Sequence, residues 1–555
     1  MKTSVAIVGG GPVGLMLGLF LETFGVDCVV FNLEKSTRWH PKGSTHNART
    51  VEHYPRVGMS PAIRNRGLPL DHPTDVAYFT RYNAWELARL KMLSEREKQA
   101  AVAASAQTDQ VLEPLLRANQ MYVERFLLES ARARSQITLR FGWRVTEFAQ
   151  DDGGVSLRAE NVAGTAPAET WRAAYLVGCD GGASFVRRTL GIHYQGESTL
   201  EQDFLGGPMI ATYLRAPRLY PDALAARRAW IYWAVNPEFG IVLIAVNGRD
   251  EFLLFNKLAA GEETPGDRSI INLVRRAAGF DAPVEIIGHF PWTAGVALVA
   301  ERFADRRVFL VRDSAHLFTP TGGFGMNTGI DDTSNLAWKL AAMVHGWGGR
   351  HLLDTYELER RPVAIRNTTA ARELAKNIGE IRVPPETEED SPRGAAARAR
   401  LGAFLSTFGE EFASLGVQLG ARYDGSPLIV GDGVPPRDDF IRYLPSAVPG
   451  GRTPHLWLAS GRTYGSSLFD HLGLGFTLLR LGADPPGGRA LEAAARRRGM
   501  PFRVLDVAAP VARELYESSL ALVRPDQYLA WRGDRVPDDP ERLLARLAGD
   551  LPAGA

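Results

Sequence analysis

The apolar and polar positions of the first thirty residues predict a strand, a tight turn, a helix and a second strand. Residues 4–8 (SVAIV) form a short continuous apolar run that is typical of a buried strand, and residues 28–31 (CVVF) form another. Between these runs, a glycine cluster precedes a largely apolar segment of helical length, 15–23. This order predicts the opening of a doubly wound α/β domain.

Two later segments carry the same signature. Residues 174–182 (AYLVGCDGG) and 307–313 (RVFLVRD) are apolar runs that reach an aspartate, and a long helical stretch, 331–345, follows the second run. We therefore expect these segments to belong to the same α/β domain as the N-terminus. That domain is assigned three pieces of chain: 1–78, 107–193 and 296–382.

Two inserts, 79–106 and 194–295, separate the three pieces. The longer insert contains strand-like apolar runs at 240–247 (GIVLIAVN) and 251–255 (EFLLF). The inserts together predict a β-rich domain that is built into the α/β domain.

The chain downstream of residue 382 predicts a linker and a further domain. The polar, proline-containing stretch VPPETEEDSPRG is typical of a linker or long loop, which we place at 383–415. Residues 416–555 then alternate apolar runs at 476–482 and 501–507 with a helical segment near 509–518. This alternation predicts a separate small α/β domain.

Composition and charge narrow the classes of function. The 555 residues carry a formal net charge of +1, which gives no reason to expect nucleic-acid binding. No apolar run approaches the roughly 18 residues that a membrane span needs, so we expect no membrane partner. The two cysteines, Cys28 and Cys179, exclude a disulfide scaffold and favour a reducing, cytoplasmic location.

The glycine cluster matches a dinucleotide-binding fingerprint. Gly9, Gly11 and Gly14 give G-x-G-x-x-G directly between the first strand and its helix, with Pro12 and Val13 inside the motif. The first glycine permits a tight turn, the second lets a pyrophosphate approach the backbone, and the third lets helix pack on strand. The motif does not separate NAD from FAD.

The second strand ends where such folds place a ribose-binding carboxylate. Asn32 occupies the strand end, Leu33 follows it, and Glu34 lies two residues further. An asparagine can still hydrogen-bond a hydroxyl. We favour Asn32 for this role over Glu34 acting from the loop.

Two further motifs suit loops around a cofactor. Asp180, in GCDGGASFVRR, follows a strand and precedes a helix start, although an ordinary turn has the same signature. In VFLVRDSAHLFTPTGGFGMNTGIDD, Asp313 ends a strand and could hold a polyol chain, and a glycine-rich turn follows. Backbone N–H groups in such a turn can stabilise negative charge on a flavin ring. The expected contacts in this turn are Pro320, Gly323, Gly325, Met326 and Asn327.

These motifs, in this order and spacing, resemble the class A flavoprotein aromatic hydroxylases. NARTVEHYPRVG (47–58) resembles the family's R-T-x-E segment, and YELERRPVA (356–364) its Y-x-x-E-R-R-P segment. The resemblance makes Arg49 the match of an FAD-phosphate arginine and Gln120 the match of a glutamine that contacts FAD. It covers essentially the whole chain and extends to the three-domain branch of phenol hydroxylases and of polyketide and indolocarbazole tailoring oxygenases.

The resemblance implies a fold and a reaction. The fold is α/β: a Rossmann-like FAD-binding domain, an inserted β-rich substrate domain and a C-terminal thioredoxin-like domain. FAD is reduced by NADPH or NADH that binds transiently, O2 adds at flavin C4a, and the hydroperoxide hydroxylates an aromatic, phenolic or polycyclic substrate. Residues 416–555 contain no cysteine, which excludes thiol exchange and leaves a role in packing or in forming a homodimer.

Two positions depart from the family pattern. Arg312 replaces the glycine of the family's G-D motif and could alter flavin mobility, meet a substrate carboxylate, or point to solvent. Ser44 stands where the phenol hydroxylase branch has an aspartate base. His46 is then a candidate base or a hydrogen-bonding support, and Pro320, Gly323 and Arg312 complete the expected reactive region.

Aromatic residues in the longer insert are candidates for the substrate pocket or for its core. They are Trp230, Tyr232, Trp233 and Phe239, with Phe252 nearby. The segment AWIYWAVNP lacks the leading glycine and the isoleucine of the flavin halogenase motif, and the histidines lack metal-ligand spacing. The alternatives that remain are a flavin oxidase, dehydrogenase or Baeyer–Villiger oxygenase, or a flavoprotein that sequesters a reactive intermediate.

Overall fold

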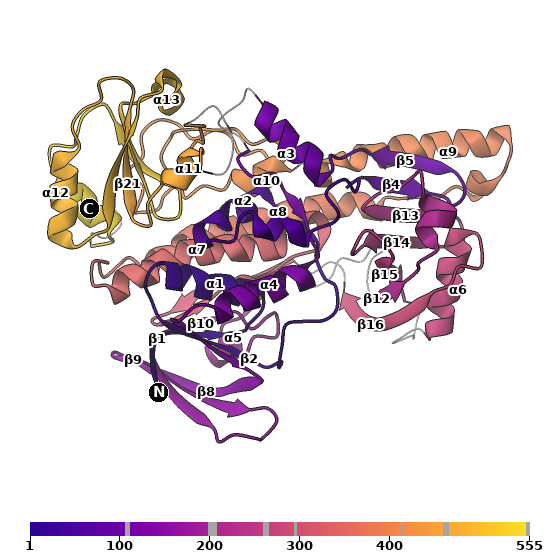
Figure 1. The fold of residues 1–555 in the computed structure, drawn as a ribbon, viewed down its shortest axis with the longest axis horizontal. Helices are drawn as coiled ribbons and strands as arrows, with labels where there is room; N and C mark the ends of the chain where they lie inside the picture. Colours follow the sequence, from indigo (N-terminus) through magenta and orange to yellow (C-terminus); the bar gives the residue numbers. More distant parts are fainter. Residues whose placement is uncertain are drawn as a thin grey trace.

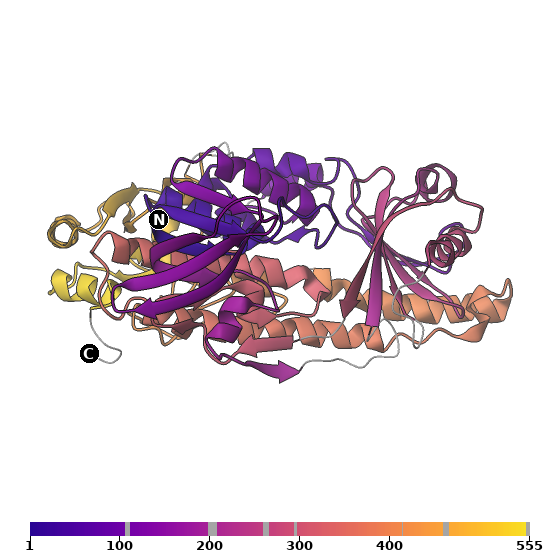
Figure 2. The ribbon, with the colours of Figure 1, turned by 90° about the horizontal axis from the view of Figure 1, so that it is seen from below.

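The computed structural model describes residues 1–105, 111–197, 208–258, 266–293, 297–412, 414–458 and 465–550. The three largest sheets of the described residues are arranged along the long axis of the molecule (Figures 1 and 2). The C-terminal sheet lies at one end and the sheet of the long insert at the other, with the N-terminal sheet and the helices α7 (Phe324–Val344) and α8 (Asp354–Gly379) between them.

The N-terminal sheet has the parallel core that the sequence predicts. Its first strand pairs in parallel with neighbours on both sides, and its last four residues are apolar and buried, as is typical of a parallel strand covered on both faces. An antiparallel extension, β8 (Trp143–Asp151) and β9 (Gly154–Asn161), joins at β10. The main strands, in spatial order, are β18 (Ala304–Asp305), β19 (Val308–Leu310), β10 (Glu169–Gly178), β1 (Lys2–Val8), β2 (Cys28–Asn32) and β7 (Ile137–Phe141).

Helices cover this sheet and fix its loops. Helix α1 (Pro12–Thr23) is buried along most of its length and packs against α7 and α4 (Gln120–Arg132). Shorter elements shape the loops: α2 (Ala48–His53), α5 (Phe185–Thr189), the pair β3 (Thr45–His46) and β6 (Leu116–Arg117), and the sheet of β11 (Tyr194–Glu197), β17 (Ala297–Ala300) and β20 (His316–Leu317).

The seven-stranded sheet confirms that the long insert is rich in strands. One face packs on its own helix, α6 (Asp267–Ala278), through a core that includes Tyr232, Ile270 and Val274. In spatial order the strands are β16 (Glu285–Thr293), β12 (Pro208–Arg215), β15 (Glu251–Lys257), β14 (Gly240–Ala245), β13 (Ile231–Val235), β4 (Val76–Phe79) and β5 (Glu86–Leu90).

The segment predicted as a linker or loop, 383–415, is not a loop. It contains the helix α9 (Pro392–Leu405), which begins at the capping residue Ser391 and packs against β5. Gly402 allows this contact, because a Cβ there would lie 2.1 Å from the carbonyl oxygen of Leu87. The proline and acidic residues that suggested a linker lie just ahead of the helix start, where they are compatible with helix initiation.

The C-terminal strands and helix also appear where the sequence places them. β21 (Phe476–Leu481) pairs in parallel with β22 (Phe502–Val507) and antiparallel with β23 (Leu520–Val523), which pairs with β24 (Leu529–Gly533). The accompanying helices are α12 (Arg489–Arg498), α13 (Pro510–Tyr516) and α14 (Pro540–Leu547); α3 (Glu95–Ala104), α10 (Leu415–Leu419) and α11 (Leu468–His471) lie in other connections.

Two boundary predictions fall at the edge of what the structure describes. The predicted transitions at residues 106–107 and 295–296 lie outside the described residues. Among the described helices, none is both long and apolar enough to cross a membrane.

Candidate active site

Four predicted cofactor positions follow parallel strands of the N-terminal sheet. Gly9 follows β1, Asn32 ends β2, Asp180 follows β10 and Asp313 follows β19. Because these strands are parallel, their carboxyl ends share one edge of the sheet, which is where doubly wound folds bind ligands. The fold therefore brings all four residues to the same edge.

The glycines of the first turn have distinct surroundings. Gly9 has φ +115°, and a Cβ there would lie 2.2 Å from the carbonyl oxygen of Cys179. A Cβ on Gly14 would lie 1.9 Å from the Gly9 oxygen, so helix α1 can approach the strand only with glycine there. A Cβ on Gly11 would meet nothing within 4 Å. The open space at Gly11, beside the start of α1, is a cradle that fits a pyrophosphate.

Asn32 faces the glycine turn, whereas the residues after it face outward. Its Oδ1 accepts a hydrogen bond from the Gly10 N–H at 3.1 Å, and its Nδ2 donates to the Glu34 carbonyl oxygen at 3.1 Å. The side chains of Leu33 and Glu34 are exposed. The polar group at the end of β2 is thus Asn32.

Asp180 holds its own loop together. Its carboxylate accepts hydrogen bonds from Ser184 Oγ at 2.5 Å and from the Val186 N–H at 3.0 Å, at the start of α5. This loop also presses the Cys179 carbonyl against Gly9. Asp180 therefore shapes the turn that borders the glycine fingerprint.

Arg312 has an unusual backbone and does not point to solvent. Its φ is +60°, and its guanidinium Nη1 lies 2.9 Å from Asp313 Oδ2. Gly329 in α7 makes room for it, since a Cβ at Gly329 would lie 2.6 Å from Arg312 Cβ. Only 20% of the Arg312 side chain is exposed, and it lines the main cavity.

The glycine-rich turn before α7 is tied to the loop that carries Ser44. Gly322 and Gly323 adopt positive φ values of +74° and +68°. Asn327 Oδ1 accepts from the Asn47 N–H at 2.9 Å, and its Nδ2 donates to the carbonyl oxygens of Thr45 and Gly323. Asn327 therefore holds the loop that carries Ser44 and the glycine-rich turn in one geometry.

The main cavity lies between this turn and the seven-stranded sheet. Its volume is about 650 Å³. One wall comes from the 40–47 loop and the glycine-rich turn, and the other from the strands of the sheet, mostly through alternate residues. The residues of the sheet wall are Met209, Ala211, Trp230, Ile231, Trp233, Val242, Ile244, Leu253, Phe255, Phe290 and Pro291.

The predicted substrate aromatics divide into two groups. Trp230 and Trp233 line the cavity. Tyr232 points to the opposite face of the sheet and is fully buried in the core there, because successive strand residues alternate between faces. Phe239 lies beneath Arg81 and Arg276, away from the cavity. The structure therefore does not support Tyr232 or Phe239 as pocket residues.

Neither of the two loop residues considered for a base, Ser44 and His46, provides one to the cavity. Ser44 lines the cavity and its Oγ accepts a hydrogen bond from Trp230 Nε1 at 3.2 Å. His46 is fully buried behind this wall, with Nδ1 2.7 Å from Tyr54 Oη and Nε2 3.2 Å from the Ala118 oxygen. Burial lowers the pKa of His46 to about 4. It supports the loop and does not reach the cavity.

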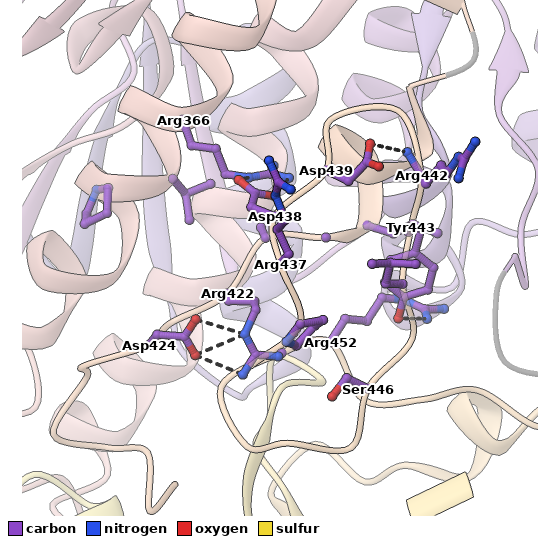
Figure 3. Close-up of a pocket in the computed structure, with 18 residues that line it drawn as sticks. Arg366, Arg422, Asp424, Arg437, Asp438, Asp439, Arg442, Tyr443, Ser446 and Arg452 are labelled. Carbon is purple, nitrogen blue, oxygen red and sulfur yellow. Dashed lines mark hydrogen bonds and ion pairs between the residues drawn. The ribbon is translucent and has the colours of Figure 1, made fainter. Parts of the chain in front are cut away.

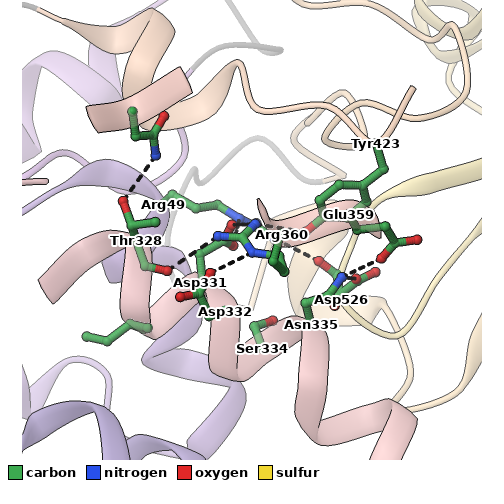
Figure 4. Close-up of polar contacts among 12 residues, drawn as sticks. Arg49, Thr328, Asp331, Asp332, Ser334, Asn335, Glu359, Arg360, Tyr423 and Asp526 are labelled. Carbon is green, nitrogen blue, oxygen red and sulfur yellow. Dashed lines mark hydrogen bonds and ion pairs between the residues drawn. The ribbon is translucent and has the colours of Figure 1, made fainter. Parts of the chain in front are cut away.

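Gln120 and Arg49 lie in different environments. Gln120 lines the cavity and its Nε2 donates to Glu124. Arg49 instead bonds to Glu52, Asp331, Gln527 and the Asp526 carbonyl, in a buried polar cluster between α7, α8 and the C-terminal domain (Figure 4). The structure does not bring Arg49 to the cavity.

Among the described residues, Arg117 and Glu411 are two of the four charged residues that line the cavity and that the sequence did not single out; Arg38 and Lys42 are the others. The guanidinium of Arg117 lies 3.6 Å from the centre of the Trp230 ring. Glu411 accepts a hydrogen bond from the Gly322 N–H at 3.3 Å. No local motif marks either residue, because strands and loops from distant parts of the chain bring them to the site.

A second, smaller pocket of about 200 Å³ lies beside α8 (Figure 3). Three of its arginines form ion pairs with carboxylates: Arg422 with Asp424, Arg366 with Asp438 and Arg452 with Glu52. Within the described residues, no group of three or more histidine, cysteine or acidic side chains is arranged to hold a metal ion.

Comparison with known proteins identifies the family. The family described as FAD binding domain matches residues 2–371, and the aromatic-ring hydroxylase C-terminal family matches residues 446–550. The chain belongs to these families, and it is an FAD-dependent monooxygenase of the aromatic hydroxylase type.

Three relatives illustrate the similarity. The FAD-dependent monooxygenase apdD of Emericella nidulans is 29% identical, over 98% of this chain and 90% of its own. The tetracenomycin B2 monooxygenase-dioxygenase of Streptomyces olivaceus is 30% identical, over 98% and 97%. A structure of chromopyrrolic acid-soaked RebC with bound 7-carboxy-K252c is 33% identical, covers 99% of this chain and 100% of that one, and gives a TM-score of 0.88. The oxidase and sequestration alternatives are not favoured.

Proposed function

We propose that this monooxygenase hydroxylates a fused polycyclic phenol held between the seven-stranded sheet and the glycine-rich turn. The observation that carries the proposal is the shape of the main cavity, which is about 650 Å³ and walled on one side by Trp230, Trp233 and aliphatic residues. The flavin ring takes the part of this volume beside the glycine-rich turn. The sheet wall left to the substrate is lined by apolar residues from five strands, which fits several fused rings better than a single ring. The tetracenomycin and RebC relatives are consistent with such a substrate.

The residues at the sheet edge fit FAD. In this proposal the pyrophosphate lies at Gly9, Gly11 and Gly14, where only Gly11 leaves open space, and Asn32 bonds the ribose. Asp313 holds the ribityl chain, and the turn from Pro320 to Asn327 borders the flavin ring. Reduced by NADPH or NADH, the flavin supplies electrophilic oxygen from O2, while the protein orients the ring and excludes water.

One end of the cavity is cationic. Arg38, Lys42 and Arg312 line it together. Arg312 is paired with Asp313, but Arg38 and Lys42 form no ion pair among the described residues, so this group favours a substrate or reductant that carries an acidic group there. We assign the departure from the family's G-D motif, Arg312, to this role.

The C-terminal domain is proposed to be thioredoxin-like. The parallel pair β21 and β22 with its helix α12, the antiparallel β23 and β24, and the closing helix α14 follow that order of elements. Without cysteine, the domain serves packing, and its contacts with Arg49 support this role.

Substrate-stimulated NAD(P)H oxidation tests the substrate class. The FAD-loaded protein is offered phenol, 2-naphthol and 2-hydroxyanthraquinone. We expect the tricyclic compound to stimulate oxidation most and Trp230→Leu to raise its KM by about tenfold, which corresponds to about 1.4 kcal/mol. Phe239→Leu, outside the cavity, is the matched control. Equal stimulation by phenol would contradict the polycyclic assignment.

A further inference from the structure

Glu411 is the carboxylic acid of the main cavity. It lies one residue before the end of the short segment Ser406–Phe412 that follows α9, and among the described residues that line the cavity no other is acidic. Its Oε1 accepts the Gly322 N–H at 3.3 Å. The adjacent Phe412 packs edge-on against Trp230, with ring centres 6.2 Å apart. The carboxyl group thus lies between the glycine-rich turn and the aromatic wall.

The second oxygen of this carboxyl group, Oε2, is available to accept a proton. Oε2 has no hydrogen-bond partner among the described residues, and it is not among their buried unpaired atoms. The charged or titratable groups that face Glu411 are Arg117 from β6 and Tyr78 from β4. Arg117 forms no ion pair with Glu411 and instead stacks on Trp230 and donates to Thr45 Oγ1.

The other polar residues of the cavity are less suited to accept a proton. Ser44 is an alcohol whose oxygen already accepts from Trp230. His40 lines the cavity but stacks on Phe290, with ring centres 4.1 Å apart, on the strand at the edge of the sheet. Arg117 and Arg312 are cations. Glu411 alone combines a basic oxygen with contact to the glycine-rich turn.

We propose that Glu411 is the general base that ionises the substrate. The proposal rests on the proposed function. The O–H bond of a ring hydroxyl breaks, its proton forms the carboxylic acid at Glu411 Oε2, and the electron pair stays on the substrate oxygen, where it activates the ring carbons toward electrophilic oxygen. Glu411 later returns the proton to solvent, so no electrons are exchanged in the step.

The electrostatics fit this role. Burial raises the pKa of Glu411 to about 7, against the opposing effects of the Gly322 N–H and Arg117. A base with a pKa near the working pH is efficient, because it is partly ionised and still accepts a proton readily. The carboxylate form increases as the pH rises through about 7, so turnover should rise over the same range.

The test compares Glu411→Gln with Glu410→Gln in the full FAD-loaded chain. Glu410 is the adjacent exposed glutamate and does not line the cavity. With 2-hydroxyanthraquinone, kcat/KM of the wild type and of Glu410→Gln should rise with a midpoint near 7. Glu411→Gln should lose this rise and roughly 10²-fold of the rate at high pH, and Glu411→Asp should recover part of both.

A substrate-independent readout accompanies the kinetics. In an infrared titration, the C=O band of a protonated carboxylic acid should disappear with a midpoint near 7 in the wild type and Glu410→Gln, and should be absent in Glu411→Gln. Wild-type rate and pH profile in flavin-loaded Glu411→Gln, or no such band in the wild type, would overturn the proposal. Failure of the wild type to hydroxylate any polycyclic phenol would instead overturn the proposed function, and this inference with it.

Discussion

The glycines of the first turn show how single residues at this site separate packing from ligand binding. Gly14 is required by protein atoms alone, because a Cβ there would lie 1.9 Å from the Gly9 oxygen. Gly11 is not constrained by protein atoms, since a Cβ would meet nothing within 4 Å. The reason for glycine at residue 11 must therefore lie in the ligand.

Alanine substitutions at these two glycines should have different consequences. Gly14→Ala should lower both the melting temperature and the FAD content, because α1 must move away from β1. Gly11→Ala should leave the melting temperature of the FAD-free protein unchanged and lower FAD affinity by at least about tenfold, or about 1.4 kcal/mol. Calorimetry of FAD-free protein and flavin fluorescence titration measure the two effects. Unchanged FAD affinity in Gly11→Ala would show that no phosphate approaches that backbone.

The sequence predicts where a residue lies when a local motif fixes its position. It does not do so when the position depends on contacts between distant parts of the chain. Gly9, Asn32 and Asp313 come to one sheet edge because the strand–turn–helix pattern dictates it. Tyr232 and Trp233 could not be told apart, because the sequence gives the alternation of a strand but not which face meets the cavity. Glu411 carries no signal at all, since its neighbour Gly322 is 89 residues away.

At the scale of elements, the ladder of β3 and β6 positions the cavity wall through a buried histidine. His46 lies in β3 and bonds to Tyr54 and to the Ala118 carbonyl beside β6. Burial lowers its pKa to about 4, below the ordinary value of about 6.5 that it has in the unfolded chain. The folded protein is therefore most stable when His46 is neutral.

This buried histidine predicts an acid-dependent stability. Between about pH 6.5 and 4 the unfolded chain binds a proton at residue 46 that the folded protein does not, so the free energy of unfolding falls as the pH falls through this window. The full effect of a shift of this size is about 3 kcal/mol. His46→Gln should flatten the dependence of unfolding free energy on pH, measured by denaturant titration, and the exposed His193→Gln should not. Equal slopes in both variants would contradict the assignment.

Element-level prediction was strong for strands and weak for connections. The apolar runs at 4–8, 28–31 and 476–482 coincide with β1, β2 and β21, because buried strands have few alternative sequences. Helix α9 was predicted as part of a linker, since the polar, proline-containing stretch ahead of it is typical of a loop and its contact with β5 is tertiary.

At the scale of the whole molecule, buried charge joins the C-terminal domain to the rest. Arg524 bonds to Glu359 of α8 and to Asp526, and Arg360 bonds to Asp331 and Asp332 of α7. Figure 4 shows Glu359, Arg360 and Asp526 in this cluster. Burial alone would raise the pKa of Asp331. The neighbouring Arg360, His53 and Arg49 outweigh burial and bring the pKa of Asp331 far below its usual value, so this carboxylate of the cluster stays ionised. The sequence resemblance implied a third domain, but it did not predict the buried ion pairs that join this domain to α7 and α8.

Removing one side chain of this buried cluster of charges should lower the free energy of unfolding substantially. Arg524→Met leaves Asp526 without a cation partner among the described residues and leaves Glu359 with only Lys339 as a cation partner, and removal of one member of a buried pair costs about 3–5 kcal/mol. Arg497→Met, which removes an exposed pair with Glu541, should cost less than about 1 kcal/mol. Thermal unfolding compares the stability of the two variants. A similar small loss of stability in both would mean that the buried cluster of charges contributes little to stability.

The central claim, that the chain inserts one atom of O2 into a polycyclic phenol, is tested most directly by turnover under ¹⁸O2. The FAD-loaded protein is supplied with NAD(P)H and 2-hydroxyanthraquinone or another polycyclic phenol that stimulates NAD(P)H oxidation, and the product and water are examined by mass spectrometry. The account predicts one labelled oxygen atom in the hydroxylated product and the other in water. Consumption of the substrate without label in the product, with hydrogen peroxide formed in equal amount, would contradict it.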